Sequence, residues 1–216
     1  MTSGGVCANI GRTPVPEKTR SYRMQRRAES QQQTRRRITE SAVALHGSVG
    51  PSRTSISAVA AHAGVRRSTV YRHFPDEAAL FDACTAHWSA ANPPPDIEAW
   101  SRIDDPDARL GVALDELYGF YRQTEHMLEN LFRDEMTVAL VQERFAAFRG
   151  YLDTARDVLM AGRGLRGAAR RRAQAALGHA IAFSTWKSLV GEQGLDDAEA
   201  AVLAGALVVG AGRGPG

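Results

Sequence analysis

The chain has 216 residues, 44% of them hydrophobic, which suffices for one domain of ordinary size or two small ones. No apolar run approaches the roughly 20 residues of a membrane span, and the N-terminus lacks the apolar core of a signal peptide. Cys7 and Cys84 form neither a metal-ligand spacing nor a disulfide framework. Composition therefore argues against a membrane-spanning or disulfide-rich secreted protein, and we expect a cytoplasmic one.

The net charge of +3 is unevenly distributed along the chain. Residues 1–75 hold 13 Lys and Arg against 3 acids, a net +10, whereas residues 76–216 carry 14 against 21, a net −7. A chain whose first third is basic and whose remaining part is acidic is typical of a DNA-binding head joined to a body that does not bind DNA.

Residues 1–30 show almost no apolar periodicity, several Gly and Pro residues, and six basic residues, so we expect a disordered basic arm. Three interpretations stay open. The arm could follow the DNA backbone or enter the minor groove, it could be a solvated tail, or translation could begin at Met24.

The spacing of Ile38, Ala42 and Leu45 predicts a helix from about Gln32 to His46, followed by a loop over 47–53. Residues 54–74 then form the most informative segment of the chain. Ile56, Val59, Ala60 and Ala63 make one apolar stripe, and this short helix begins after the capping residues Thr54 and Ser55. Gly64 follows it and permits a tight turn.

A second short helix follows that turn. Val65, Val70 and Phe74 can anchor it from below, which leaves an outward face rich in arginine and hydroxyl groups with no acid. Such a face suits phosphates and base edges, so the pattern is a helix-turn-helix. The expected DNA-binding residues are Thr54, Ser55, Arg66, Arg67, Ser68, Thr69, Tyr71, Arg72 and His73.

In detail the segment resembles the TetR family of bacterial transcriptional repressors, over roughly residues 34–84. The resemblance rests on Val59-Ala60, Ala63-Gly64-Val65 and the run Ser68 to Phe74. Asp76 to Phe81 looks like the start of that family's fourth helix. Glu77 departs from the pattern, because the family often has a lysine there, and so does Ser57, which replaces a frequently charged residue.

The fourth helix is expected over Asp76–Ala91 and ends at Asn92-Pro93-Pro94-Pro95, which we take as the domain boundary. Residues 31–92 then form the DNA-binding domain, and residues 93–216 form a helical regulatory and dimerisation domain. The expected fold class is all-α.

Apolar stripes predict helices over about Asp105–Gln123, Glu125–Arg133 and 141–159 within the second domain. The glycine-rich segment 162–167 is interpreted as an inter-helix turn, because it lacks a Walker lysine and a preceding strand.

A helix over Ala168–Val190 is apolar on two sides and so needs two partners. The last helix, over 196–210, is rich in small and apolar residues, with Ala201 and Gly205 one turn apart. We expect a homodimer through these two C-terminal helices, although a core helix of a monomer is the alternative.

No nucleophile–base pair or metal-ligand spacing stands out, so we expect no enzyme, metal or cofactor. The acids near His126 and the pair Asp134-Glu135 are interpreted as exposed helix faces and turn contacts. Only the family resemblance favours an apolar effector pocket over plain core. Its candidate residues are Tyr118, Tyr121, Phe132, Met136, Phe148, His179, Phe183 and Trp186.

The resemblance implies a repressor that binds a pseudo-palindromic double-stranded operator as a dimer and is released by a small apolar or aromatic effector. The effector would shift the fourth helix and change the separation of the two heads. A constitutive DNA-binding protein with a solid body, and a helical enzyme with a vestigial head, are the alternatives.

Overall fold

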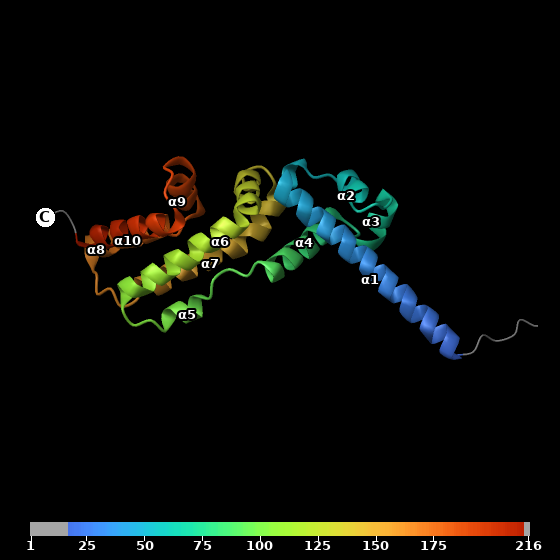
Figure 1. Cartoon of the computed structure of the whole chain (residues 1–216), viewed down its shortest axis with the longest axis horizontal. Helices are drawn as coiled ribbons and strands as arrows, with labels where there is room; N and C mark the ends of the chain where they lie inside the picture. The colour runs from blue at the N-terminus through green and yellow to red at the C-terminus, as the bar shows by residue number, and fades with distance from the viewer. Residues whose placement is uncertain (1–16, 214–216) are drawn as a thin grey trace, which may run out of the picture.

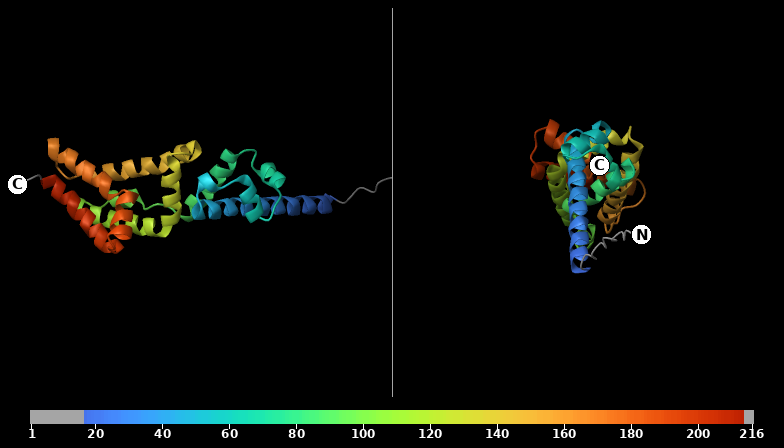
Figure 2. Two further views of the ribbon diagram at one scale, coloured as in Figure 1. Left: turned by 90° about the horizontal axis from the view of Figure 1, so that it is seen from above. Right: turned by 90° about the vertical axis from the view of Figure 1, so that its right-hand side faces the viewer.

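The structure, a computed structural model, describes residues 17–213. Every regular element in this range is helical, which confirms the all-α fold class. The molecule is elongated, with residues 17–91 at one end and residues 97–213 at the other (Figures 1 and 2). We call these two parts the head and the body.

The head consists of α1 (Glu17–Ser48), the short 3-10 helix η1 (Pro51–Arg53), α2 (Ile56–His62), α3 (Arg67–His73) and α4 (Glu77–Ala91). Its core is built from the apolar stripes that the sequence shows, with Ile38, Val70 and Phe74 almost completely buried. Gly64 has a φ of 63°, the left-handed conformation that the turn between α2 and α3 requires.

The first helix corrects one expectation. It is a single helix of 32 residues that begins at Glu17, so residues 17–30 are helical rather than disordered. Residues 1–16 lie outside the described range. The sequence lacks apolar periodicity over residues 22–33 because this part of α1 has no buried face: every side chain from Tyr22 to Gln33 is exposed.

The body consists of α5 (Ile97–Ser101), α6 (Pro106–Glu135), α7 (Ala139–Met160), α8 (Gly167–Ala180), α9 (Phe183–Lys187), the short π-helix η2 (Ser188–Glu192) and α10 (Asp197–Arg213). Helix α5 was not expected; Asp96 caps it and Trp100 buries it against the body. Helix α10 packs against both α6 and α8. No helix within residues 17–213 is both long and apolar enough to cross a membrane.

Helix α6 is one element where the sequence predicted two. Thr124, at the expected break, donates a hydrogen bond from its hydroxyl to the carbonyl oxygen of Phe120 (2.6 Å). Such a bond to the preceding turn bends a helix without ending it, and α6 changes direction along its length in Figure 2.

The expected single helix over 168–190 is interrupted in the structure. It ends at Ala180 and resumes at Phe183, because Ala182 is extended, with a ψ of 138°. Two buried tyrosines donate hydrogen bonds to backbone carbonyl groups at this break. The hydroxyl of Tyr118 donates to the oxygen of Ala180 (2.9 Å), and that of Tyr121 donates to the oxygen of Ile181 (2.5 Å). Without such donors the break would leave unpaired buried carbonyls.

Candidate DNA-binding surface and ligand cavity

Helix α3 presents the expected outward face. Arg66, Arg67, Ser68 and Arg72 are exposed, and Thr69 is half-buried. Tyr71 keeps 39% of its surface exposed although it is a large aromatic residue. Val70, by contrast, is fully buried and fixes the helix to the head. The face is therefore available to an anionic partner while the opposite side holds the fold.

Arg67 and Tyr71 form a pair one turn apart on this face. Arg67 donates from Nη2 to the hydroxyl oxygen of Tyr71 (3.1 Å), and its guanidinium lies 5.5 Å from the ring centroid. The Tyr71 hydroxyl keeps its own hydrogen for another acceptor. The pair thus offers a cation and a hydroxyl donor side by side.

Thr54 and Ser55 have structural hydrogen bonds of their own. Ser55 caps α2 by accepting a hydrogen bond from the backbone N–H of Ala58 (3.1 Å). Thr54 donates its hydroxyl hydrogen to the carbonyl oxygen of Gly50 (2.8 Å). These two side chains stabilise the start of α2. Any contact with DNA would be a second role for them.

The end of α3 is tied to α1 through Arg35. Its Nη1 donates to the carbonyl oxygen of His73 (2.5 Å), and its guanidinium lies 4.1 Å from the centroid of the Phe74 ring. The half-buried His73 has an Nε2 atom with no hydrogen-bond partner among the described residues. Burial, together with Arg72 and Arg35, lowers the pKa of His73. Helix α1 therefore passes directly beside the recognition face.

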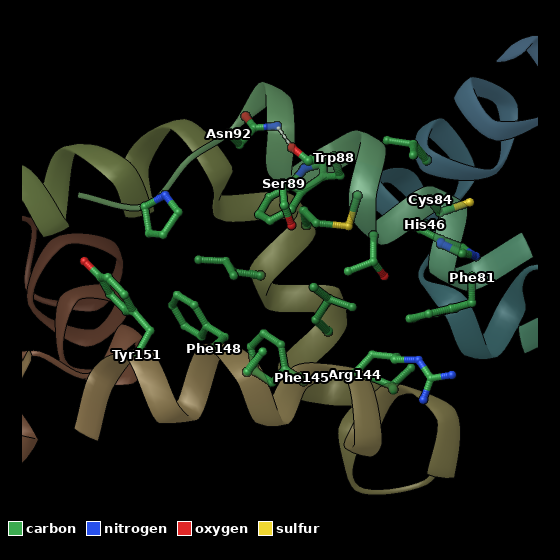
Figure 3. Close-up of a pocket in the computed structure, with 18 of the residues that line it drawn as sticks. His46, Phe81, Cys84, Trp88, Ser89, Asn92, Arg144, Phe145, Phe148 and Tyr151 are labelled. Atoms are coloured by element: carbon green, nitrogen blue, oxygen red, sulfur yellow. Dashed lines mark hydrogen bonds between the residues drawn. The ribbon is translucent and has the colours of Figure 1, made fainter. Parts of the chain in front are cut away.

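A cavity of about 230 Å³ lies between α4, α6 and α7, next to the end of α1 (Figure 3). Its walls are mainly aromatic and aliphatic. The lining includes His46, Phe81, Cys84, Trp88, Phe120, Leu128, Leu131, Arg144, Phe145, Ala147, Phe148 and Tyr151.

The polar groups of this lining are few and mostly occupied. Tyr151 donates to the carbonyl oxygen of Pro95 (3.0 Å), and the side chain of Asn92 donates to that of Trp88 (2.9 Å). Burial lowers the pKa of His46 to about 4, although Asp134 opposes this shift, so the imidazole is neutral near pH 7. The cavity suits an apolar molecule.

The eight residues expected to line one pocket lie in several different places in the structure. Phe148 lines the cavity, and Phe132 stacks on Phe183 with ring centroids 5.3 Å apart. Tyr118, Tyr121 and Trp186 are buried in the body core. His179 and Met136 are exposed, with Met136 86% exposed.

Sequence reasoning missed the part of the lining that comes from α4. The sequence predicted this helix over Asp76–Ala91, but none of its residues was among the pocket candidates. Helix α4 in fact faces two ways: Leu80 and Cys84 belong to the head core, while Phe81, Cys84 and Trp88 line the cavity.

A second link between head and body lies at the end of α6. Asn130 donates from Nδ2 to the carbonyl oxygens of His46 (3.0 Å) and Gly47 (2.8 Å). The carboxylate of Asp134 accepts from the backbone N–H of Ser52 (2.9 Å). Burial opposes the charge of Asp134, but hydrogen bonds from Arg133 and Ser52 outweigh it and lower the pKa of the carboxyl group.

On the exposed side of the cavity, Arg144 of α7 forms an ion pair with Asp82 of α4 (2.5 Å). Head and body are thus joined by α4, by the segment 46–52 at and after the end of α1, and by this ion pair. Among residues 17–213, no cluster of three or more His, Cys, Asp and Glu side chains could hold a metal ion.

Residues 38–84 match the family model described as bacterial regulatory proteins, tetR family. A search of curated proteins finds no match to this sequence.

Solved structures match over most of the chain. A TetR-like transcriptional regulator from Rhodococcus sp. RHA1 is 20% identical, with a TM-score of 0.62 over 84% of this chain and 97% of that one. The transcriptional regulator FadR from Bacillus subtilis, in complex with stearoyl-CoA, is 18% identical, with a TM-score of 0.54 over 81% and 97%. NalD, the secondary repressor of the MexAB-OprM multidrug efflux pump in Pseudomonas aeruginosa, is 22% identical, with a TM-score of 0.56 over 86% and 96%.

These likenesses establish the fold, and the family match covers the helix-turn-helix together with the first half of α4. The resemblance to the TetR family is therefore confirmed, and the chain has the fold of TetR-family transcriptional regulators.

Proposed function

We propose that this chain, with its TetR-family helix-turn-helix, is a repressor that binds a pseudo-palindromic operator as a homodimer and is released by a small apolar effector. The single observation that carries the proposal is the double role of α4. The same helix closes the head core and forms a wall of the body cavity, through Cys84 on both sides. Whatever fills the cavity presses on the element that positions the head.

DNA reading is assigned to α3. Arg67 lies at the start of the helix, where an arginine can pair with the edge of a guanine, and Tyr71 is placed to donate to a phosphate. Arg66, Ser68, Thr69 and Arg72 surround them. Two such helices enter successive major grooves, about one helical turn apart.

The homodimer is assigned to α8 and α10, which pack on one another. One side of α10 is buried on the body, and the other carries exposed apolar side chains: Val202 is 74% exposed and Leu207 is 56% exposed. Apolar residues on the outside of a packed helix pair are typical of an interface with a second copy.

The effector is assigned to the cavity beside α4. Its volume of about 230 Å³ and its aromatic walls suit a small hydrocarbon or aromatic compound without a buried charge. FadR, which has the same fold, is in complex with stearoyl-CoA, and the apolar acyl chain of that ligand supports an apolar binding site in this fold. The effector weakens operator binding because it binds the released conformation more tightly than the DNA-bound one. The loss of binding free energy cannot exceed this difference in effector affinity.

A cavity-filling variant tests this assignment. Ala147 lies on the exposed rim of the cavity, and a tryptophan there would occupy the space without disturbing the core. Ala147→Trp should abolish binding of the uncharged apolar fluorophore N-phenyl-1-naphthylamine, while Ala146→Trp, at the exposed neighbouring position outside the lining, should retain it. A compound that binds the wild type should release operator DNA from Ala146→Trp but not from Ala147→Trp. Equal behaviour of the two variants would refute the effector site.

The constitutive alternative predicts a body packed solid, and the cavity disfavours it. The enzyme alternative needs a polar pocket with reactive groups, whereas the aromatic lining and the bonded polar groups of this cavity favour binding over chemistry.

A further inference from the structure

The first half of α1 extends beyond the head. Residues 17–34 span about 27 Å at the usual rise per residue. In Figures 1 and 2 this extension runs past α2 and α3 and leads away from the body. Every side chain of this extension from Tyr22 to Gln33 is exposed.

The extension carries a stripe of positive charge. Arg23, Arg26 and Arg27 are spaced i, i+3 and i+4, so they share one face of the helix, and all three are exposed. Among the described residues, no ion pair involves them. The acid nearest to them, Glu29, accepts a hydrogen bond from Gln25 (3.2 Å) instead.

This arrangement is unfavourable in the isolated protein. Arg23 and Arg27 are like charges one turn apart, which destabilises a helix. A polyanion beside the stripe would remove this cost.

The position of the extension identifies the polyanion. Arg35, where the extension joins the head, donates to the carbonyl oxygen of His73 at the end of the recognition helix. Any DNA seated on α3 therefore continues toward the residues that precede Arg35. The extension has no packed apolar face that would anchor a protein or a bilayer.

We propose that the helical extension of α1, through Arg23, Arg26 and Arg27, binds the phosphate backbone of DNA flanking the half-site that α3 reads. The inference rests on the proposed DNA-binding function and adds a second contact to it. The operator bound by the full chain is then longer than the two half-sites alone, and the added contact carries affinity but no base sequence.

The test compares two duplexes and matched variants of the full chain. An operator sequence selected from random DNA is prepared with about one helical turn (roughly 10 base pairs) of flanking DNA on each side, and also trimmed to the half-sites. The variant Arg23→Gln/Arg27→Gln removes two charges of the stripe. Arg23→Lys/Arg27→Lys keeps them, and Arg102→Gln/Arg166→Gln removes two exposed arginines of the body.

On the flanked duplex, the glutamine variant of the stripe should bind more weakly than the wild type. Because both protomers of the proposed dimer contact flanking DNA, its slope of log K against log salt should be shallower by about 3.6, or 0.9 for each of the four lost phosphate contacts. The lysine variant and the body variant should keep the wild-type slope. On the trimmed duplex all four proteins should bind alike.

Unchanged affinity and slope of the glutamine variant on the flanked duplex would overturn the inference, as would an equal loss on both duplexes. Tighter binding by that variant would overturn it too, because the extension would then be held by acidic groups of the protein itself. In each case the wild type still binds its operator, so the proposed function stands. A wild type that selects no sequence contradicts both.

Discussion

At the scale of single residues, the Arg67–Tyr71 pair is the most specific feature of the recognition face. Tyr71→Phe removes a hydroxyl that accepts from Arg67 and is free to donate to DNA. Because one hydrogen bond is worth about 1 kcal/mol and the proposed dimer places two Tyr71 residues on the operator, affinity should fall about thirtyfold, with thermal unfolding unchanged. Gel-shift titration measures the loss. Ser101→Ala, which removes an exposed hydroxyl group of the body, is the control.

His46 gives the head a pH-dependent stability. Burial lowers its pKa to about 4, whereas a histidine in the unfolded chain titrates near 6.5. Between these values the unfolded chain binds the proton more readily, so the free energy of unfolding falls as the pH drops from about 6.5 towards 4. The lowered pKa of His73 acts in the same direction.

Urea unfolding at pH 7 and pH 5 tests this account. His46→Gln should reduce the loss of stability between the two pH values. His62→Gln, at an exposed histidine of the same head, should leave the wild-type loss in place. An equal loss in wild type and His46→Gln would show that this imidazole is not buried as the structure has it.

At the scale of elements, the loop between α1 and α2 fits tightly against the end of α6. Gly50 has a φ of 94°, and a Cβ atom built there would lie 2.0 Å from Nη2 of Arg133 and 2.6 Å from Oδ2 of Asp134. Gly50→Ala should therefore lower the free energy of unfolding by more than about 1 kcal/mol. Gly111→Ala, in helix α6 with nothing near its Cβ position, should raise it by roughly 0.5–1 kcal/mol. Equal unfolding midpoints for the two variants would contradict the fit.

Local patterns could be predicted from the sequence, and contacts between elements could not. The stripe of Ile56, Val59 and Ala60, with Ser55 as cap, identifies α2 because every interaction lies within a few residues. The cavity was missed because its walls come from distant segments, such as Phe81 and Phe120.

The break after Ala180 was missed for the same reason. The tyrosines that stabilise it, Tyr118 and Tyr121, lie about 60 residues earlier in the chain. The helical part of the arm before Ile38 was missed because it lacks the buried face on which a periodicity argument depends.

At the scale of the whole molecule, the proposed dimer depends on the outer side of α10. The sequence pattern suggested Gly205 as a contact point, but the Cβ position of Gly205 lies 3.8 Å from Leu114 of the same chain. The exposed apolar residues are Val202, Leu203 and Leu207. These residues are the better probe, because their replacement leaves the body core untouched.

Leu207→Glu should convert the dimer to a monomer in sedimentation, because two carboxylates would meet across the two-fold axis. Operator affinity should collapse with it, although α3 is unchanged. Val112→Glu, at an exposed valine of α6, should sediment as the wild type does. A Leu207→Glu protein that remains dimeric would place the interface elsewhere.

The most direct test of the whole account is selection of bound sequences from random DNA by the full-length wild type, followed by footprinting on the selected site. The account predicts an enriched pseudo-palindrome whose two half-sites are protected about one helical turn apart, and loss of that protection in Tyr71→Phe combined with Thr69→Ala. Enrichment of no sequence, or protection of a single unrepeated site by a monomer, would contradict it.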